Sequence, residues 1–315
     1  LLTKTSTKVQ KLEDEAFWYV HLPEELKIFT PRLVSFDKDK SSASLTQELY
    51  GYPSLQELYL SGEVNLEDWN YIIKSLFSLH KKFEKFKGET NPDAIKWLYY
   101  DKTKERLSDL RAQNPYWNEV LDREFEYING KKYRGIASLK SGIDIYVQKL
   151  CKTGKETVIH GDYCFSNILF DSSNYNFKLV DPRGRLNNEP TIYGDPRYDI
   201  AKLRHSIAGF YDFIVHGLFR LKENKTGFEY EIKTSVDYSI LEMIFNKYAE
   251  LNGYNPQEIK FIEGLLFLSM IPLHKDNFSR QKVFYLKAIE LLNDTVKIRG
   301  KLNNEKVLSL VRSRG

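Results

Sequence analysis

The chain has 315 residues, of which 42% are hydrophobic and 14% aromatic, and its formal net charge is +4. This composition can bury one large core or the cores of two lobes, which excludes an intrinsically disordered protein. The small net charge excludes the strongly basic balance of many nucleic-acid-binding proteins, and the two cysteines, Cys151 and Cys164, lack the spacing of a disulfide framework or a zinc site.

The first 50 residues predict a small β-containing region. The pattern predicts, in chain order, a strand over 1–5, a helix over 7–21, and two strands over 32–36 and 43–50. Pro23 ends the helical pattern, and the polar residues 37–42 have the composition of a hairpin loop.

A helical region begins after Gly51 and Pro53. Apolar residues at helical spacing predict helices over 66–86, 93–112 and 143–152, with a hairpin at 127–133 around Asn129-Gly130, and the pattern is again helical from residue 200 to the end. The longest nearly apolar run, 264–273, is about half of what spans a bilayer. We therefore expect no membrane span, and we expect a cytoplasmic protein because nothing indicates disulfides.

A short β-rich segment at 157–185 interrupts the helices and carries the polar groups of most interest. Its predicted strands are 157–159, 168–170 and 177–180. Asp162 follows the first strand, Asn167 closes the next loop, and Asp181 follows the last strand. Because the hairpin returns the chain, we expect these three side chains to meet at one edge.

Asp162, Asn167 and Asp181 suit phosphoryl transfer, which needs a divalent metal, an aligned nucleophile and positive charge. In this interpretation Asp162 is the catalytic base that orients the attacking hydroxyl, while Asn167 and Asp181 bind Mg²⁺. His160 braces the loop. Each residue alone is explained as well by turn formation, so the inference depends on the combination.

The segment His160-Gly161-Asp162, with Asn167 five residues after Asp162, resembles the catalytic loop HGDxxxxN of the aminoglycoside phosphotransferase and choline kinase family. The resemblance implies a bilobed protein-kinase-like α+β fold, with a partial N-lobe at 1–50 and a mainly helical C-lobe at 51–315. It also implies an ATP-dependent phosphotransferase that uses Mg²⁺ and a small-molecule hydroxyl acceptor.

Further positions extend the resemblance. Lys4 resembles the lysine that binds nucleotide phosphates, and Glu15 resembles its helix partner, with Glu13 as a competing choice. Asp199 resembles the structural aspartate that braces the catalytic loop. The interlobe hinge, which contacts adenine in the family, corresponds to Glu48, Leu49 and Tyr50.

The family's first two strands and phosphate-covering loop have no counterpart in this sequence. We expect an upstream portion of the protein to supply these strands and this loop. A nucleotidyltransferase domain in the same chain is one possible upstream portion. The alternative is a sequence that begins too late to bind nucleotide well.

Acceptor contacts are expected just after the catalytic segment. The candidates there are Arg183, Arg197, His205, Tyr211 and Asp212. For the arginines, a solvated loop or a salt bridge is the structural alternative. The segments around Asp181–Gly184 and Asp195–Ser206 resemble bacterial relatives associated with capsule and surface-polysaccharide biosynthesis, which implies a sugar or polyol acceptor, with an amino alcohol also open.

Three classes of function therefore remain open. A kinase predicts Mg²⁺-dependent transfer that needs Asp162. A pseudokinase or nucleotide-binding regulatory module predicts the fold without turnover. A binder of RNA or anionic surfaces would use the basic tail at 297–314, although a packed amphipathic helix is the preferred interpretation of that tail and no nucleic-acid partner is expected.

Overall fold

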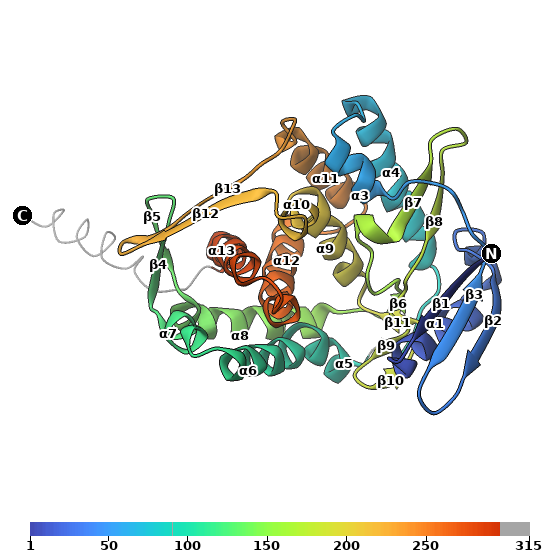
Figure 1. Cartoon of the computed structure of the whole chain (residues 1–315), viewed down its shortest axis with the longest axis horizontal. Helices are drawn as coiled ribbons and strands as arrows, with labels where there is room; N and C mark the ends of the chain where they lie inside the picture. Colours follow the sequence, from blue (N-terminus) through green and yellow to red (C-terminus); the bar gives the residue numbers. More distant parts are fainter. Residues whose placement is uncertain (90, 297–315) are drawn as a thin grey trace, which may run out of the picture.

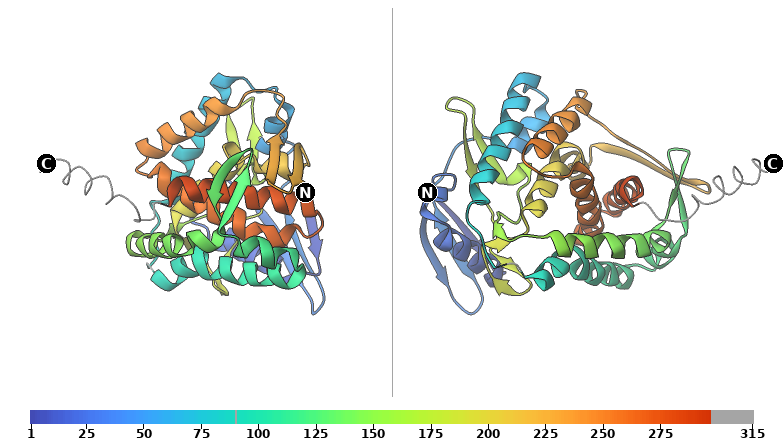
Figure 2. Two further views of the ribbon diagram at one scale, coloured as in Figure 1. Left: turned by 90° about the vertical axis from the view of Figure 1, so that its left-hand side faces the viewer. Right: turned by 180° about the vertical axis from the view of Figure 1, so that it is seen from behind.

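The computed structural model describes residues 1–89 and 91–296. Figure 1 shows a small sheet and its helix at one end of the molecule, next to a mainly helical part. The views in Figure 2 agree, and they place the long β12–β13 hairpin at the opposite end. The helix expected over the basic tail at 297–314 lies outside the described residues.

The N-terminal part contains an antiparallel three-stranded sheet in the order β1-β3-β2. Its elements are β1 (Leu2–Ser6), α1 (Val9–His21), α2 (Glu24–Lys27), β2 (Leu33–Lys38) and β3 (Ala43–Gln47). Leu12 and Ala16 lie one helical turn apart on α1 and pack on Leu45 of β3, in a cluster separate from the main core. The N-terminal part therefore has a hydrophobic core of its own.

The second part is mainly helical. Its helices are α3 (Leu55–Ser61), α4 (Leu66–Phe83), α5 (Pro92–Lys96), α6 (Lys102–Gln113), α7 (Tyr116–Asp122), α8 (Ile136–Thr153), α9 (Pro196–Ile207), α10 (Tyr211–Val215), α11 (Ser239–Leu251), α12 (Pro256–Met270) and α13 (Phe278–Thr295). A π-helical turn at Trp97–Asp101 joins α5 to α6. Helix α12 lies at the centre and packs against α13, α9 and α6, which explains its nearly continuous apolar sequence.

Three two-stranded pairs lie between the two parts (Figure 1). They pair β6 (Thr157–Val158) with β11 (Tyr193–Gly194), β7 (Ile168–Asp171) with β8 (Asn176–Leu179), and β9 (Arg185–Leu186) with β10 (Glu189–Pro190). A single 3₁₀ turn, Phe165–Asn167, connects the catalytic loop to β7. The strands predicted in the catalytic segment are thus present within one or two residues.

One expectation is wrong. The chain after residue 200 was expected to be helical, yet it contains the hairpin of β12 (Phe219–Asn224) and β13 (Gly227–Ile232). This hairpin joins β4 (Phe125–Ile128) and β5 (Lys131–Arg134) in a four-stranded sheet. The physical reason is a period of two, with apolar residues alternating with charged ones, around a Gly227 whose φ of 141° suits a turn.

The bilobed α+β architecture expected from the sequence is confirmed: a small sheet with its own core precedes a large helical part. The hairpin at Asn129-Gly130 is also present, and both residues have positive φ, 50° and 75°. In the described residues, no helix is long and apolar enough to cross a membrane.

Candidate active site

Asp199 of α9 holds the loop at 160–167, the candidate catalytic loop, in place. Its carboxylate accepts the backbone N–H groups of His160 at 2.7 Å and of Gly161 at 2.9 Å, and Asp199 is fully buried. Gly161 has φ of +79°, and a Cβ there would lie 2.5 Å from Cβ of Arg183, so only glycine fits without strain. The bracing role expected of Asp199 is confirmed.

His160 also acts within this loop. Its side chain is buried, and its Nδ1 accepts the backbone N–H of Asp162 at 3.3 Å. Burial lowers the pKa of His160, so the neutral ring is favoured. A neutral imidazole can accept this hydrogen bond, which fits a loop-bracing residue.

Asp162 contacts both Asn167 and a lysine of α9. Asn167 Nδ2 donates to Oδ2 of Asp162 at 3.0 Å, and Lys202 Nζ lies 2.7 Å from Oδ1. The Asp162 side chain is 41% exposed, so it remains open to the cleft. Burial opposes its ionisation, but the charge and hydrogen bond of Lys202 outweigh that effect and lower the pKa of Asp162.

Asp181 meets the N-terminal lobe through Lys4. The Lys4 ammonium contacts Asp181 and lies 2.7 Å from Oε1 of Glu15. Burial opposes the charge on Lys4, yet Glu15 and Asp181 together raise its pKa. Glu13 lies elsewhere, in an ion pair with Lys38, so Glu15 is the helix carboxylate that contacts Lys4.

The chain after Asp181 packs tightly against α1. Asp181 itself has φ of +57°, and Gly184 has φ of +63° with its Cα so close to α1 that a Cβ would lie 1.8 Å from the carbonyl oxygen of Asp14. Arg185 Nε donates to both carboxylate oxygens of Asp14, at 2.9 and 2.8 Å. These contacts hold the segment after Asp181 against the N-terminal lobe.

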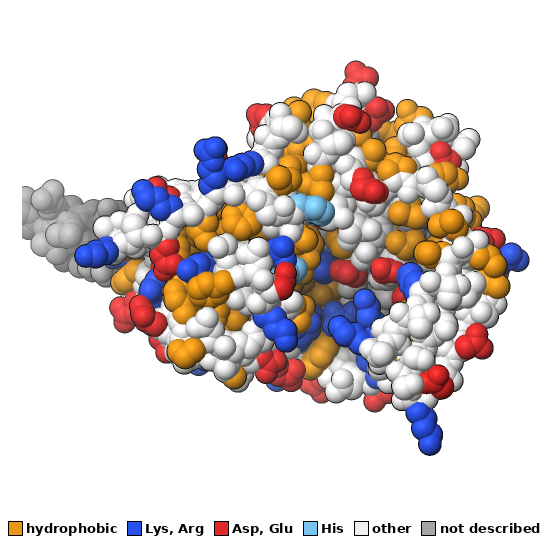
Figure 3. Space-filling view, viewed as in Figure 1, with side chains coloured by type: hydrophobic (Ala, Val, Ile, Leu, Met, Phe, Trp, Pro, Cys, Tyr) orange, Lys and Arg blue, Asp and Glu red, His pale blue; other side chains and the backbone are white. Residues whose placement is uncertain are grey.

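Asp162, Asn167 and Asp181 line one cleft of about 730 Å³. Figure 3 shows a hollow between the N-terminal sheet and the helical part, with Lys and Arg side chains gathered around it and a few carboxylates beside them. The cleft therefore combines oxygen ligands with positive charge, as expected for phosphoryl transfer.

Asn167 and Asp181 supply one amide oxygen and one carboxylate. No group of three or more His, Cys, Asp or Glu residues that could hold a metal occurs among residues 1–89 and 91–296. Two protein oxygens nevertheless fit Mg²⁺, which usually keeps several waters and shares substrate phosphates. Asp181 is 44% exposed to the cleft and Asn167 lines the same cleft, so the donor set suits that ion.

The predicted hinge residues lie apart from this cleft. The Tyr50 hydroxyl donates to Oε2 of Glu48 at 3.0 Å, and both side chains line a second cleft of about 630 Å³ that also contains Arg32. The backbone N–H of Glu48 donates to the carbonyl oxygen of Arg32 at 3.0 Å. The structure does not bring these side chains to Asp162, and their contact with adenine stays a prediction.

Arg197 is held by structural partners. Its Nε lies 3.0 Å from each carboxylate oxygen of Asp195, and its Nη2 donates to the Leu150 carbonyl oxygen at 2.7 Å. It is buried and joins the start of α9 to the end of α8. Arg197 therefore has a structural role, and it is not among the residues that line the cleft with Asp162.

His205, Tyr211 and Asp212 are not among the residues that line the cleft with Asp162. His205 is fully buried against Phe267, with ring centroids 4.0 Å apart, and burial lowers its pKa well below the ordinary value. Asp212 is also fully buried and accepts a hydrogen bond from Gln56 at 2.9 Å. Tyr211 is half-buried, and its ring lies 4.4 Å from the ring of His205. Among the five acceptor candidates, Arg183 is the one that lines the cleft with Asp162.

Among the other residues that line the cleft, Arg106 and Lys202 were not predicted from the sequence. A signal existed for Lys202, which lies one helical turn after Asp199 and so faces the same loop. Arg106 comes from α6, more than 50 positions before the catalytic loop, and nothing in the sequence connects it to Asp162.

No family model matches the sequence, and no curated protein matches it. Among solved structures the chain is similar to a crystal structure of aminoglycoside-3'-phosphotransferase of type VIII. The sequence identity is 15%, the match covers 92% of this chain and 84% of that chain, and the TM-score is 0.44. A likeness at this level does not identify a reaction, so the functional proposal depends on the geometry of the cleft.

Proposed function

We propose that the chain is an ATP-dependent phosphotransferase that acts on a hydroxyl group of a small metabolite. The observation that supports this most strongly is the contact of Lys4 with Asp181, a residue 177 positions later that lines the same cleft as Asp162 and Asn167. A lysine, two carboxylates and an amide from separate elements are the groups that phosphoryl transfer requires.

In the proposed reaction, Asp162 accepts a hydrogen bond from the acceptor hydroxyl and takes its proton. The hydroxyl oxygen forms a bond to the γ-phosphorus, the bond from that phosphorus to the β,γ-bridging oxygen breaks, and ADP leaves with the electron pair. Lys4 contacts the nucleotide phosphates, and Lys202 keeps Asp162 ionised and oriented.

Asn167 and Asp181 would hold Mg²⁺, which neutralises charge on the phosphates when it is bound. Lys4, which contacts Asp181 here, would then share its positive charge between that carboxylate and the nucleotide. The role of Glu15 is to hold the Lys4 ammonium in place.

The sequence resemblance supports finer parts of the proposal. A sugar, polyol or amino alcohol acceptor, a role in surface-polysaccharide biosynthesis and a preceding nucleotidyltransferase domain are proposed from it. The cytoplasmic location is proposed because the two cysteines show no disulfide pattern. The length of the intact chain and the genes expressed with it test these parts separately from the reaction.

The test is acceptor-stimulated release of ADP with Mg²⁺, across sugars, polyols and amino alcohols. We expect Asp162→Asn to lower kcat by at least about a hundredfold, while Asp109→Asn, a change of an exposed aspartate on α6, leaves turnover unchanged. Nucleotide binding without any turnover, in a protein with native circular dichroism, would favour the pseudokinase instead.

A further inference from the structure

We propose that the acceptor carries an anionic group, a phosphate ester or a carboxylate, and that Arg106, Arg183 and Tyr198 bind this group beside Asp162. This inference rests on the proposed function, because it names the class of acceptor that the same cleft takes. It departs from the cationic acceptors, aminoglycosides and choline, after which the family that the sequence resembles is named.

Arg183 has a fixed position next to the catalytic loop. Its backbone N–H donates to the carbonyl oxygen of His160 at 2.9 Å, and its Cβ lies against Gly161. Arg106 approaches from α6 and lines the same cleft. Both guanidinium groups thus belong to the wall beside Asp162.

Neither arginine forms an ion pair with a carboxylate in the described part of the chain. Arg183 Nη1 donates to the Tyr198 hydroxyl at 3.3 Å, and Arg106 Nη1 donates to the Ser269 carbonyl oxygen at 3.0 Å. A guanidinium has five N–H donors, so most of theirs have no partner among these residues. By contrast, the neighbouring Arg185 is bound to the carboxylate of Asp14.

The Tyr198 hydroxyl lies between two cationic side chains. Lys102 Nζ donates to it at 3.2 Å, in addition to the contact from Arg183, and Lys102 is only 4% exposed. A hydroxyl oxygen has two lone pairs and one hydrogen. With both lone pairs accepting, the hydrogen of Tyr198 is available for a ligand that accepts hydrogen bonds, as an anion does.

The charges in this wall oppose one another. Burial, together with the charges of Arg183, Arg106 and Lys202, lowers the pKa of Lys102 well below its ordinary value. Burial also lowers the pKa of Arg106, and Arg183 adds to that shift. The ring of Trp97, 5.8 Å from Lys102 Nζ and 6.0 Å from Arg183 Cζ, compensates only part of this cost. A bound anion would supply the missing counter-charge.

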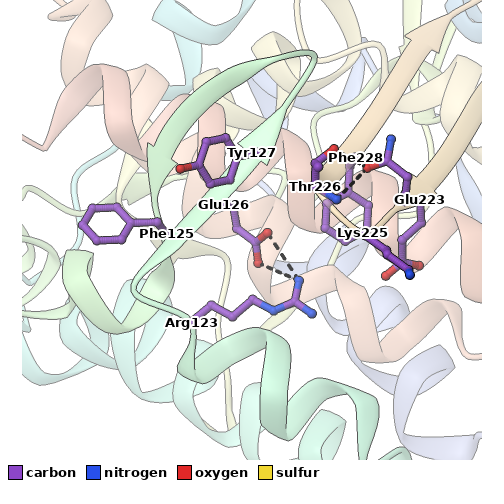
Figure 4. A pocket seen from close by; sticks show the side chains of 10 residues that line it. Arg123, Phe125, Glu126, Tyr127, Glu223, Lys225, Thr226 and Phe228 are labelled. Atoms are coloured by element: carbon purple, nitrogen blue, oxygen red, sulfur yellow. Dashed lines mark hydrogen bonds and ion pairs between the residues drawn. The ribbon is translucent and has the colours of Figure 1, made fainter.

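A second pocket contains an arginine and two glutamates that are all paired within the protein. It lies between β4 and the β12–β13 hairpin, and Figure 4 shows Arg123 and Glu126 directed toward one another there. Arg123 lies 2.7 Å from Glu119 and 3.4 Å from Glu126, and Glu223 pairs with Lys282. The cleft beside Asp162 differs because Arg106 and Arg183 lack such partners.

Trp97 provides a direct readout, because the other three tryptophans, Trp18, Trp69 and Trp117, are at most 1% exposed and far more shielded from an added ligand. We expect inorganic phosphate, titrated into the full chain, to change the intrinsic fluorescence. Arg106→Gln and Arg183→Gln should each raise the Kd for phosphate by about tenfold or more. Arg111→Gln, on the same helix but paired with Asp122, should leave the Kd unchanged.

Lys4→Met separates this site from the nucleotide site, since it should leave the phosphate titration unchanged. The proposal is wrong if Lys4→Met abolishes phosphate binding, or if Arg106→Gln and Arg183→Gln do not weaken it. Because binding is measured without turnover, the result stands whether or not the chain is a kinase.

The second test measures turnover with four matched acceptors: glycerol, glycerate, glycerol phosphate and choline. We expect the two anionic acceptors to have kcat/KM values at least about tenfold above glycerol, and Arg183→Gln to remove that preference. A larger kcat/KM for glycerate than for glycerol phosphate assigns the anion as a carboxylate. A preference for choline contradicts the proposal.

Discussion

The ammonium group of Lys202 lies 2.7 Å from Oδ1 of Asp162, and this ion pair joins helix α9 to the catalytic loop. Helix α9 holds the loop in a second way, because Asp199, one turn earlier, binds the backbone N–H groups of His160 and Gly161. One helix therefore sets both the position of the loop and the charge of its aspartate.

Lys202→Met should shift the acidic limb of the pH–activity profile to higher pH. Burial alone raises the pKa of Asp162, and Lys202 reverses that shift in the wild type. Asp162 must be ionised to take the acceptor proton, so without Lys202 activity is lost at a higher pH. The measurement is kcat/KM against pH, with Lys260→Met as a control at an ion pair with Asp294. An unchanged acidic limb would contradict the role given to Lys202.

Glu15→Gln should lower kcat/KM for ATP by about tenfold, because a neutral amide holds the Lys4 ammonium more weakly than a carboxylate does. Glu13→Gln is the matched control, two positions away on α1 and paired with Lys38 rather than Lys4. Initial rates at varied ATP concentration give kcat/KM for ATP in both variants. Equal losses in the two variants would show that the effect concerns the stability of α1 and not Lys4.

The catalytic segment was predictable because its residues are close in sequence. Asp162 and Asn167 belong to one loop, and two short paired strands return the chain from Asn167 to Asp181, so the hairpin alone brings the three together. Lys4 and Glu15 were inferred through the family resemblance, since no local pattern connects Lys4 to a residue 177 positions later.

The place of Arg106 in the proposed anion-binding wall and the structural role of Arg197 were not predictable in this way. Arg106 reaches the cleft only through the packing of α6 on α12, which no local pattern encodes. Arg197 lies next to the catalytic segment in sequence, but Asp195 and the end of α8 bind its guanidinium. The sequence position of a charged side chain indicates which part of the molecule it belongs to, but only the three-dimensional fold determines which group it binds.

Gly184→Ala should destabilise the protein by about 2 kcal/mol or more. The residue has φ of +63°, and its Cβ would lie 1.8 Å from the backbone oxygen of Asp14, which cannot move without displacing α1. Gly130→Ala is the control, since Gly130 has φ of +75° with no atom within 4 Å of a Cβ, so backbone strain alone should cost about 1 kcal/mol. Urea denaturation measures both losses, and equal losses would contradict the proposed clash.

Asp212 should make stability depend on pH between about 4 and 6. Burial raises its pKa from 3.8 to about 6, and hydrogen bonds from Ser206 and Gln56 reduce the shift only in part. A carboxyl group whose pKa is higher in the folded state stabilises the fold fully below its unfolded pKa. That contribution is lost as pH rises through the folded pKa.

The shift corresponds to about 3 kcal/mol, at about 1.4 kcal/mol for each pKa unit. Asp212→Asn cannot ionise, so its free energy of unfolding relative to wild type should rise by about 2 kcal/mol between pH 4 and pH 7, since at pH 4 the unfolded carboxyl group is already partly ionised. Denaturant unfolding at both pH values measures the difference, with Asp109→Asn as an exposed control. An equal difference in the free energy of unfolding between Asp212→Asn and wild type at both pH values would contradict this prediction. Asp212 would then ionise as easily in the folded protein as in the unfolded one, and its carboxylate would need a counter-charge that Gln56 and Ser206 do not provide.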